Sequence, residues 1–163
     1  MARQEAPVVI AYDGSEVSRA ALREAAKLFP GRPAVVVTVW EPGLATMAVG
    51  TPDAMSMGMS MMPDPATVEA VDRLQREHAS TVVAQGAELA GSLGLAAEPL
   101  AVPDERDVAD TVMDIARQRD AGVVVVGSHG ITGLRSRLLG SVARRLIEHC
   151  DRPVLVIRGA DKG

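Results

Sequence analysis

Residues 123–141, VVVVGSHGITGLRSRLLGS, contain the stretch that decides the fold of this chain. Four consecutive valines end at Gly127, Gly130 follows after two residues, and Gly140 and Ser141 follow after nine more. A run of β-branched residues without polar alternation is typical of a strand buried on both faces of a parallel sheet. In an open sheet of this kind, ligands bind beyond the carboxyl ends of the strands. The segment therefore predicts an α/β fold with a ligand site where this strand ends.

The rest of the chain alternates between short apolar runs and segments of helical periodicity. Ser15 is a good N-cap for the first helix, and Pro99 indicates that the third strand lies at a sheet edge. Strands are expected at 8–12, 34–40, 96–102, 121–127 and 152–157, and helices at about 15–29, 66–93, 103–116 and 141–150. This order predicts one domain over residues 1–163, an open five-stranded parallel sheet with helices on both faces.

Two of the helices differ in how clearly they mark an apolar face. In the first helix, Val17, Ala21, Ala25 and Leu28 share one face, which we expect to be buried. The long second helix has a loose apolar stripe, so we expect part of it to face solvent. That stripe consists of Val68, Val71, Val82 and Leu89.

Composition and charge narrow the class of protein. The 163 residues carry a formal net charge of −4, so the chain lacks the basic surface that nucleic-acid binding needs. The single cysteine, Cys150, cannot form an intrachain disulfide, which favours a reducing compartment. There is no apolar run as long as a membrane span and no secretory signal. We therefore expect a cytoplasmic protein without a nucleic-acid or membrane partner.

The glycine pattern predicts a phosphate cradle in two parts. If the first and fourth strands are neighbours, the turns Asp13–Ser15 and Gly127–Gly130 face one crevice. Glycine lets the backbone approach a ligand closely and adopt positive φ. Gly140 and Ser141 begin a helix, whose free N–H groups and dipole attract an anion. Neither the Walker A motif nor the dinucleotide-binding G-x-G-x-x-G fingerprint is present.

The spacing G-x-x-G-x9-G-S resembles the nucleotide-binding motif of the universal stress protein family. The stretches VVIAYDGSEVSRAALREA (residues 8–25) and RPVLVIR (residues 152–158) are also similar to that family. The resemblance covers nearly the whole chain except about residues 43–65. It implies a Rossmann-like fold of the adenine nucleotide alpha hydrolase type, ATP as the ligand and a homodimer. Pairing is expected through the last strand, because its apolar edge must be covered.

The resemblance and the charge of the ligand together assign roles at the expected nucleotide site. Asp13 is placed at the nucleoside end, because a carboxylate repels phosphates. The resemblance puts the backbone near Val39 against the adenine edge. Arg135 or Arg137 in the nine-residue loop could clamp the polyphosphate, and the alternative is that both are solvated loop charges. His129 flanks the phosphates and is not expected to act as a general base. The expected nucleotide-binding residues are Ala11, Asp13, Val39, Gly127, Ser128, His129, Gly130, Arg137, Gly140, Ser141 and Val142.

Several functions remain open from the sequence. The favoured one is an ATP-binding regulatory or stress-survival protein. The alternatives are a slow ATPase or phosphotransfer enzyme, a cyclic-AMP binder, and a scaffold with an empty pocket. No carboxylate pair, catalytic lysine or triad supports efficient chemistry, so we assign no catalytic residue. Mg²⁺ can accompany the phosphates, bound mainly by them and by water.

The methionine-rich stretch MSMGMSMM at 55–62 lies in an irregular insertion at about 43–65, which we expect to be flexible. M-x-M spacing can hold copper(I) through thioethers. A lid, or a surface for an unknown protein partner, is favoured over that reading. We assign no metal site, because His149 and Cys150 are adjacent and have no further ligand at a suitable spacing.

Overall fold

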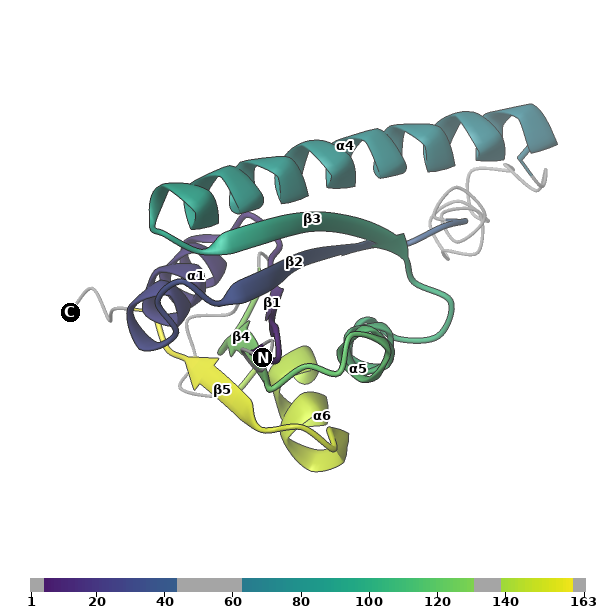
Figure 1. Cartoon of the computed structure of the whole chain (residues 1–163). Coiled ribbons are helices and arrows are strands. Elements are labelled where there is room, and N and C mark those ends of the chain that lie inside the picture. The colour runs from purple at the N-terminus through teal and green to yellow at the C-terminus, as the bar shows by residue number, and fades with distance from the viewer. Residues whose placement is uncertain (1–4, 44–62, 131–138, 160–163) are drawn as a thin grey trace.

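The computed structural model describes residues 5–43, 63–130 and 139–159 (Figure 1). Five parallel strands form one sheet in the order β3-β2-β1-β4-β5. The predicted α/β class and five-stranded parallel sheet are confirmed. The elements are β1 (Val8–Ala11), α1 (Glu16–Leu28), β2 (Pro33–Trp40), α4 (Pro65–Ser92), β3 (Ala96–Pro103), α5 (Val108–Gln118), β4 (Val123–Gly127), α6 (Ser141–His149) and β5 (Val154–Ile157).

The helices cover both faces of the sheet. Helices α1 and α4 lie on one face, and α5 and α6 lie on the other (Figure 1). The strand order reverses between β1 and β4, since the chain first adds β2 and β3 on one side and later β4 and β5 on the other. This is the switch point at which ligand sites form in doubly wound sheets. As predicted, β3 is an edge strand, and β1 and β4 are neighbours, which meets the condition set for a shared crevice.

Helix α1 begins as predicted but buries a different set of residues at its end. Ser15 is the N-cap, and its hydroxyl accepts a hydrogen bond from the Ser18 N–H at 3.1 Å. The prediction that Leu28 is buried is wrong, because its exposed fraction is 56%. Leu28 lies in the last turn, and the neighbouring Phe29 packs against the core instead.

Helix α4 contacts the sheet through small residues. The expected stripe is only half-buried, and the buried positions are Ala79, Val83, Gly86 and Ala90. A Cβ atom at Gly86 would lie 2.7 Å from Cδ1 of Tyr12, so glycine allows the helix to approach the sheet closely there. None of residues 65–78 is buried, which confirms that part of this helix faces solvent.

Helix α5 begins at Val108 and not at Pro103, which still belongs to β3. The side chain of Asp107 accepts a hydrogen bond from the Ala109 N–H at 2.8 Å and so caps the helix. Within the residues that the structure describes, no helix combines the length and apolar character needed to cross a membrane. Most of the methionine-rich insertion, including 55–62, lies outside the described residues, as does Arg137.

Candidate functional site

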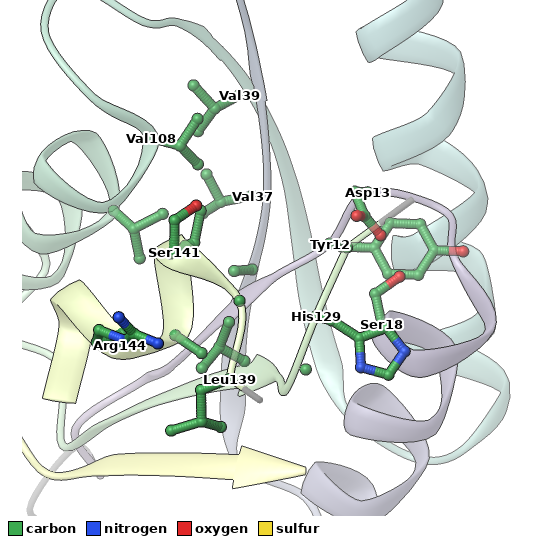
Figure 2. Close-up of a pocket in the computed structure, with 18 of the residues that line it drawn as sticks. Tyr12, Asp13, Ser18, Val37, Val39, Val108, His129, Leu139, Ser141 and Arg144 are labelled. Atoms are coloured by element: carbon green, nitrogen blue, oxygen red, sulfur yellow. The ribbon is translucent and has the colours of Figure 1, made fainter. Parts of the chain in front are cut away.

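A cavity of about 580 Å³ opens at the carboxyl ends of β1, β2 and β4, beside the start of α6 (Figure 2). This volume lies within the range of ligand-binding pockets, about 300–1,000 Å³. The structure brings most of the predicted site residues together around it. Those that line it are Ala11, Asp13, Val39, Gly127, His129, Gly130, Gly140, Ser141 and Val142.

Helix α6 presents an open N-terminus to the cavity. Its N-cap is Gly140, which has no side chain to cap the helix, whereas α1 and α5 are capped by side chains. The Gly140 N–H donates to the Ser128 carbonyl at 2.7 Å. The next three N–H groups, of Ser141, Val142 and Ala143, have no partner within the helix because of α-helix geometry. All three residues line the cavity, so this end of α6 can receive an anion.

The motif glycines are needed because segments of the protein approach one another closely. None of Gly127, Gly130 and Gly140 has a positive φ, so these positions do not use the left-handed conformation that glycine permits. A Cβ atom at Gly127 would lie 2.8 Å from Cγ1 of Val17 on α1. One at Gly140 would lie 3.2 Å from Cα of His129. The glycines therefore allow β4, α1 and α6 to meet at the edge of the cavity.

Asp13 is held at the start of α1. Its Oδ1 atom accepts a hydrogen bond from the Ser15 N–H at 3.0 Å. Its Oδ2 atom would lie 2.8 Å from a Cβ atom at Gly130, so this glycine leaves room for the carboxylate. In Figure 2, Asp13 and His129 lie on one side of the cavity, and Ser141 and Arg144 lie on the other. The carboxylate is thus separated from the open helix end.

The main chain of Val39 offers a donor and an acceptor at the cavity. The Tyr12 N–H donates to the Val37 carbonyl at 2.8 Å, which is the last bond of the β1–β2 ladder in the described chain. The Trp40 carbonyl accepts instead from Asp104 at the end of β3, at 2.7 Å. Main-chain groups of alternate strand residues point to opposite neighbours, so Val39 faces the β1 side, as Val37 does. Strand β1 has already ended there at Ala11.

Of the predicted site residues that the structure describes, Ser128 is the one that does not line the cavity. Its side chain is buried, and its Oγ atom lies 3.1 Å from Nδ1 of His129. A buried serine that does not line the cavity is not placed as a nucleophile for a bound ligand. In the described part of the chain, no group of three or more His, Cys, Asp or Glu side chains is arranged to hold a metal ion.

Sequence reasoning missed both the apolar wall of the cavity and two of its charges. Val37, Val108, Val112 and Leu139 supply apolar surface, and Glu41 and Arg144 are the further charged residues. Alternation along β2 could have indicated Val37, which lies two residues before Val39. Helical spacing could have indicated Arg144, three positions after Ser141. No local pattern indicates that α5 reaches this end of the sheet.

Comparison with known proteins identifies the family. Residues 6–158 match the model of the universal stress protein family, and the chain belongs to that family. The universal stress protein YxiE of Bacillus subtilis is 27% identical over 151 residues, which cover 93% of this chain and 97% of YxiE.

Solved structures share the fold. The structure of MJ0577 from Methanocaldococcus jannaschii has a TM-score of 0.71 at 18% identity, with 96% of this chain and 97% of that one covered. A universal stress protein from Archaeoglobus fulgidus in complex with dAMP has a TM-score of 0.60 at 22% identity, with 95% and 99% covered. A universal stress protein in complex with cAMP has a TM-score of 0.61 at 20% identity, with 94% and 97% covered.

Proposed function

We propose that this protein binds ATP as a regulatory nucleotide, with the phosphates at the start of α6 and little catalysis. The observation that carries the proposal is the open N-terminus of α6, whose free N–H groups line a cavity of nucleotide size. Complexes of related proteins with dAMP and cAMP support an adenine nucleotide as the ligand.

The two ends of the cavity suit the two ends of a nucleotide. Phosphates are favoured beside the N–H groups of α6, and they are disfavoured near the carboxylate of Asp13. The Asp13 carboxylate is better suited to accept hydrogen bonds from ribose hydroxyls. The nucleoside therefore lies toward Asp13 and Val39, and the phosphates lie toward Ser141.

The main chain of Val39 favours adenine over guanine. Its carbonyl can accept from the 6-amino group of adenine, while its N–H donates to N1. Guanine carries a donor at N1 and an acceptor at O6, so the same contacts would place donor against donor and acceptor against acceptor. Sites that bury such mismatched polar groups reject the wrong ligand strongly.

The same geometry favours retention over turnover. Backbone N–H groups stabilise the bound ground state as well as the transition state, and uniform binding gives affinity without rate. Fast phosphoryl transfer needs a metal held by protein carboxylates and a positioned nucleophile. The carboxylate of Asp13 is assigned to the nucleoside end, and Mg²⁺ would be bound mainly by the phosphates and water.

We also infer that the protein acts in the cytoplasm as a homodimer that pairs through β5. This strand is an edge of the sheet, and its sequence VLVI is apolar and half-buried in one copy of the chain. Pairing two copies would cover that edge symmetrically.

The direct test is the ligand that purifies with the protein. Trp40 and Tyr12 are the only strong chromophores at 280 nm, so a bound adenine would visibly shift the absorbance maximum toward 260 nm. Denaturation should release an adenine nucleotide for chromatography, and titration calorimetry should show ATP binding far more tightly than GTP. A protein that binds no adenine nucleotide at millimolar concentration would refute the proposal. Single-turnover hydrolysis of bound ATP within seconds would refute the regulatory part of it.

A further inference from the structure

Two adjacent arginines on α6 have different surroundings. Arg145 binds Asp110, with Nη2 2.9 Å from Oδ2, and this ion pair raises the pKa of the guanidinium. Arg144 lines the cavity, and no carboxylate of residues 5–43, 63–130 or 139–159 forms an ion pair with it. The charge of Arg145 is therefore compensated within the fold, whereas Arg144 has no such carboxylate partner among the described residues.

Arg144 lies beside the open end of α6. Its N–H donates to the Gly140 carbonyl at 3.0 Å, so it stands one helical turn after the N-cap. Side chains on a helix tilt toward its N-terminus, so the side chain at this position covers the turn that contains Ser141. Figure 2 shows Arg144 beside the first turn of α6, on the same side of the cavity as Ser141.

Successive phosphates of a nucleotide would first contact the N–H groups at the start of α6 and then Arg144. The proposed function puts the nucleoside beside Asp13 and Val39, so the first phosphate after the ribose would reach the N–H groups at the start of α6, which also line the cavity. Further phosphates must extend toward solvent, where the exposed Arg144 is found. A guanidinium binds phosphate oxygens with paired N–H groups in a fixed geometry.

We propose that Arg144 reads the number of phosphates, binding the phosphates beyond the first and making the site prefer nucleoside di- and triphosphates over mono- and cyclic monophosphates. This inference rests on the proposed function, because it assigns the same cavity to a nucleotide. It adds a specificity-determining residue outside the glycine motif.

The test compares Arg144→Gln with Arg145→Gln. Both variants remove one positive charge from the same helix, but Arg145 does not line the cavity. Calorimetric titrations would use adenosine, AMP, cyclic AMP, ADP and ATP against wild type and both variants. We expect Arg144→Gln to lower ATP affinity about threefold to tenfold, the effect of one exposed charge-assisted contact. The affinities for AMP and adenosine should change less than about twofold. The single phosphate of AMP is bound by the N–H groups of α6, and adenosine has no phosphate.

The outcomes separate this inference from the proposed function. A ratio of ATP to AMP affinity that falls only in Arg144→Gln supports the role of Arg144, and the difference from wild type should shrink as salt screens the charges. An unchanged ratio in Arg144→Gln, or a loss of adenosine binding as large as the loss of ATP binding, overturns it and leaves the proposed function standing. If wild type binds no nucleotide, both fail.

Discussion

Replacing Ser141 by proline and by alanine will separate the two groups that this residue offers to a phosphate. Alanine removes only the hydroxyl, while proline removes the hydroxyl and the main-chain N–H. Proline is tolerated at the first position of a helix, because the N–H at that position has no partner within the helix. The preceding Gly140 has φ −62° and ψ 161°, an extended conformation that suits a residue before proline. Helix α4 already begins with Pro65 in this way.

The expected losses follow from these contacts. Ser141 is exposed at the rim of the site, so loss of its hydroxyl should cost ATP binding about 1 kcal/mol, roughly fivefold in Kd. The N–H contact to a charged oxygen is worth about 1.5 kcal/mol more, at the low end for charged acceptors. Ser141→Pro should therefore weaken ATP binding by about 2.5 kcal/mol, or roughly 70-fold. The free energy of unfolding should change by no more than about 0.5 kcal/mol in either variant.

Titration calorimetry with ATP and adenosine, together with urea unfolding, checks both expectations. Adenosine has no phosphate, so its affinity reports whether the nucleoside end of the cavity has stayed intact. If folded Ser141→Pro binds ATP as tightly as Ser141→Ala does, the phosphates do not contact the N-terminus of α6 and the orientation of the nucleotide is wrong.

Three further predictions concern the packing that holds the site. Gly86→Ala should lower the free energy of unfolding by about 1–2 kcal/mol in a urea titration. The clash of the new methyl group with the Tyr12 ring exceeds the gain in helix propensity of about 1 kcal/mol. An unchanged midpoint would show that α4 can move away from the sheet. Thr38→Val should cost about 1–2 kcal/mol by the same measurement, since the Tyr12 carbonyl loses its 2.7 Å hydrogen bond from the buried hydroxyl; equal stability would mean that water replaces it. The hydrogen bond from Arg145 lowers the pKa of Asp110, so its stabilisation is present above the ordinary carboxyl pKa of about 3.9 and lost as pH falls through the folded value. The difference in Tm between wild type and Asp110→Asn should therefore be present at neutral pH and disappear in acid, and a difference that persists in acid would contradict this origin.

The five-stranded parallel sheet could be predicted because the determining signals are local. The apolar runs at β1 and β4 are continuous, and each ends in small polar residues where the site forms. The Ser15 cap and the glycine before Ser141 are likewise read within a few residues. Sequence reasoning therefore found the fold, and most of the predicted site residues line the cavity.

The packing role of the motif glycines and the position of Arg144 could not be predicted, because both depend on contacts between segments that are distant in the sequence. Gly127 is required by Val17 on α1, and Gly130 by the Asp13 carboxylate, so no local pattern distinguishes these glycines from turn glycines. Arg144 and Arg145 are identical and adjacent in the sequence. Only the packing of α5 against α6 brings Asp110 to one of them and leaves the other at the cavity.

The same contacts explain how one motif could position both ends of the proposed nucleotide. The Gly140 N–H binds the Ser128 carbonyl and fixes the start of α6 against the end of β4. The absence of a side chain at Gly130 admits the Asp13 carboxylate, whose other oxygen accepts a hydrogen bond from the N–H of Ser15, the N-cap of α1. The spacing between the N–H groups of α6 and the Asp13 carboxylate is thus set by contacts within the chain, which exist before any ligand binds. Because such preorganisation lowers the ordering cost of binding, we expect the glycines to contribute to the proposed nucleotide affinity mainly by positioning donors and acceptors and less by touching the nucleotide themselves.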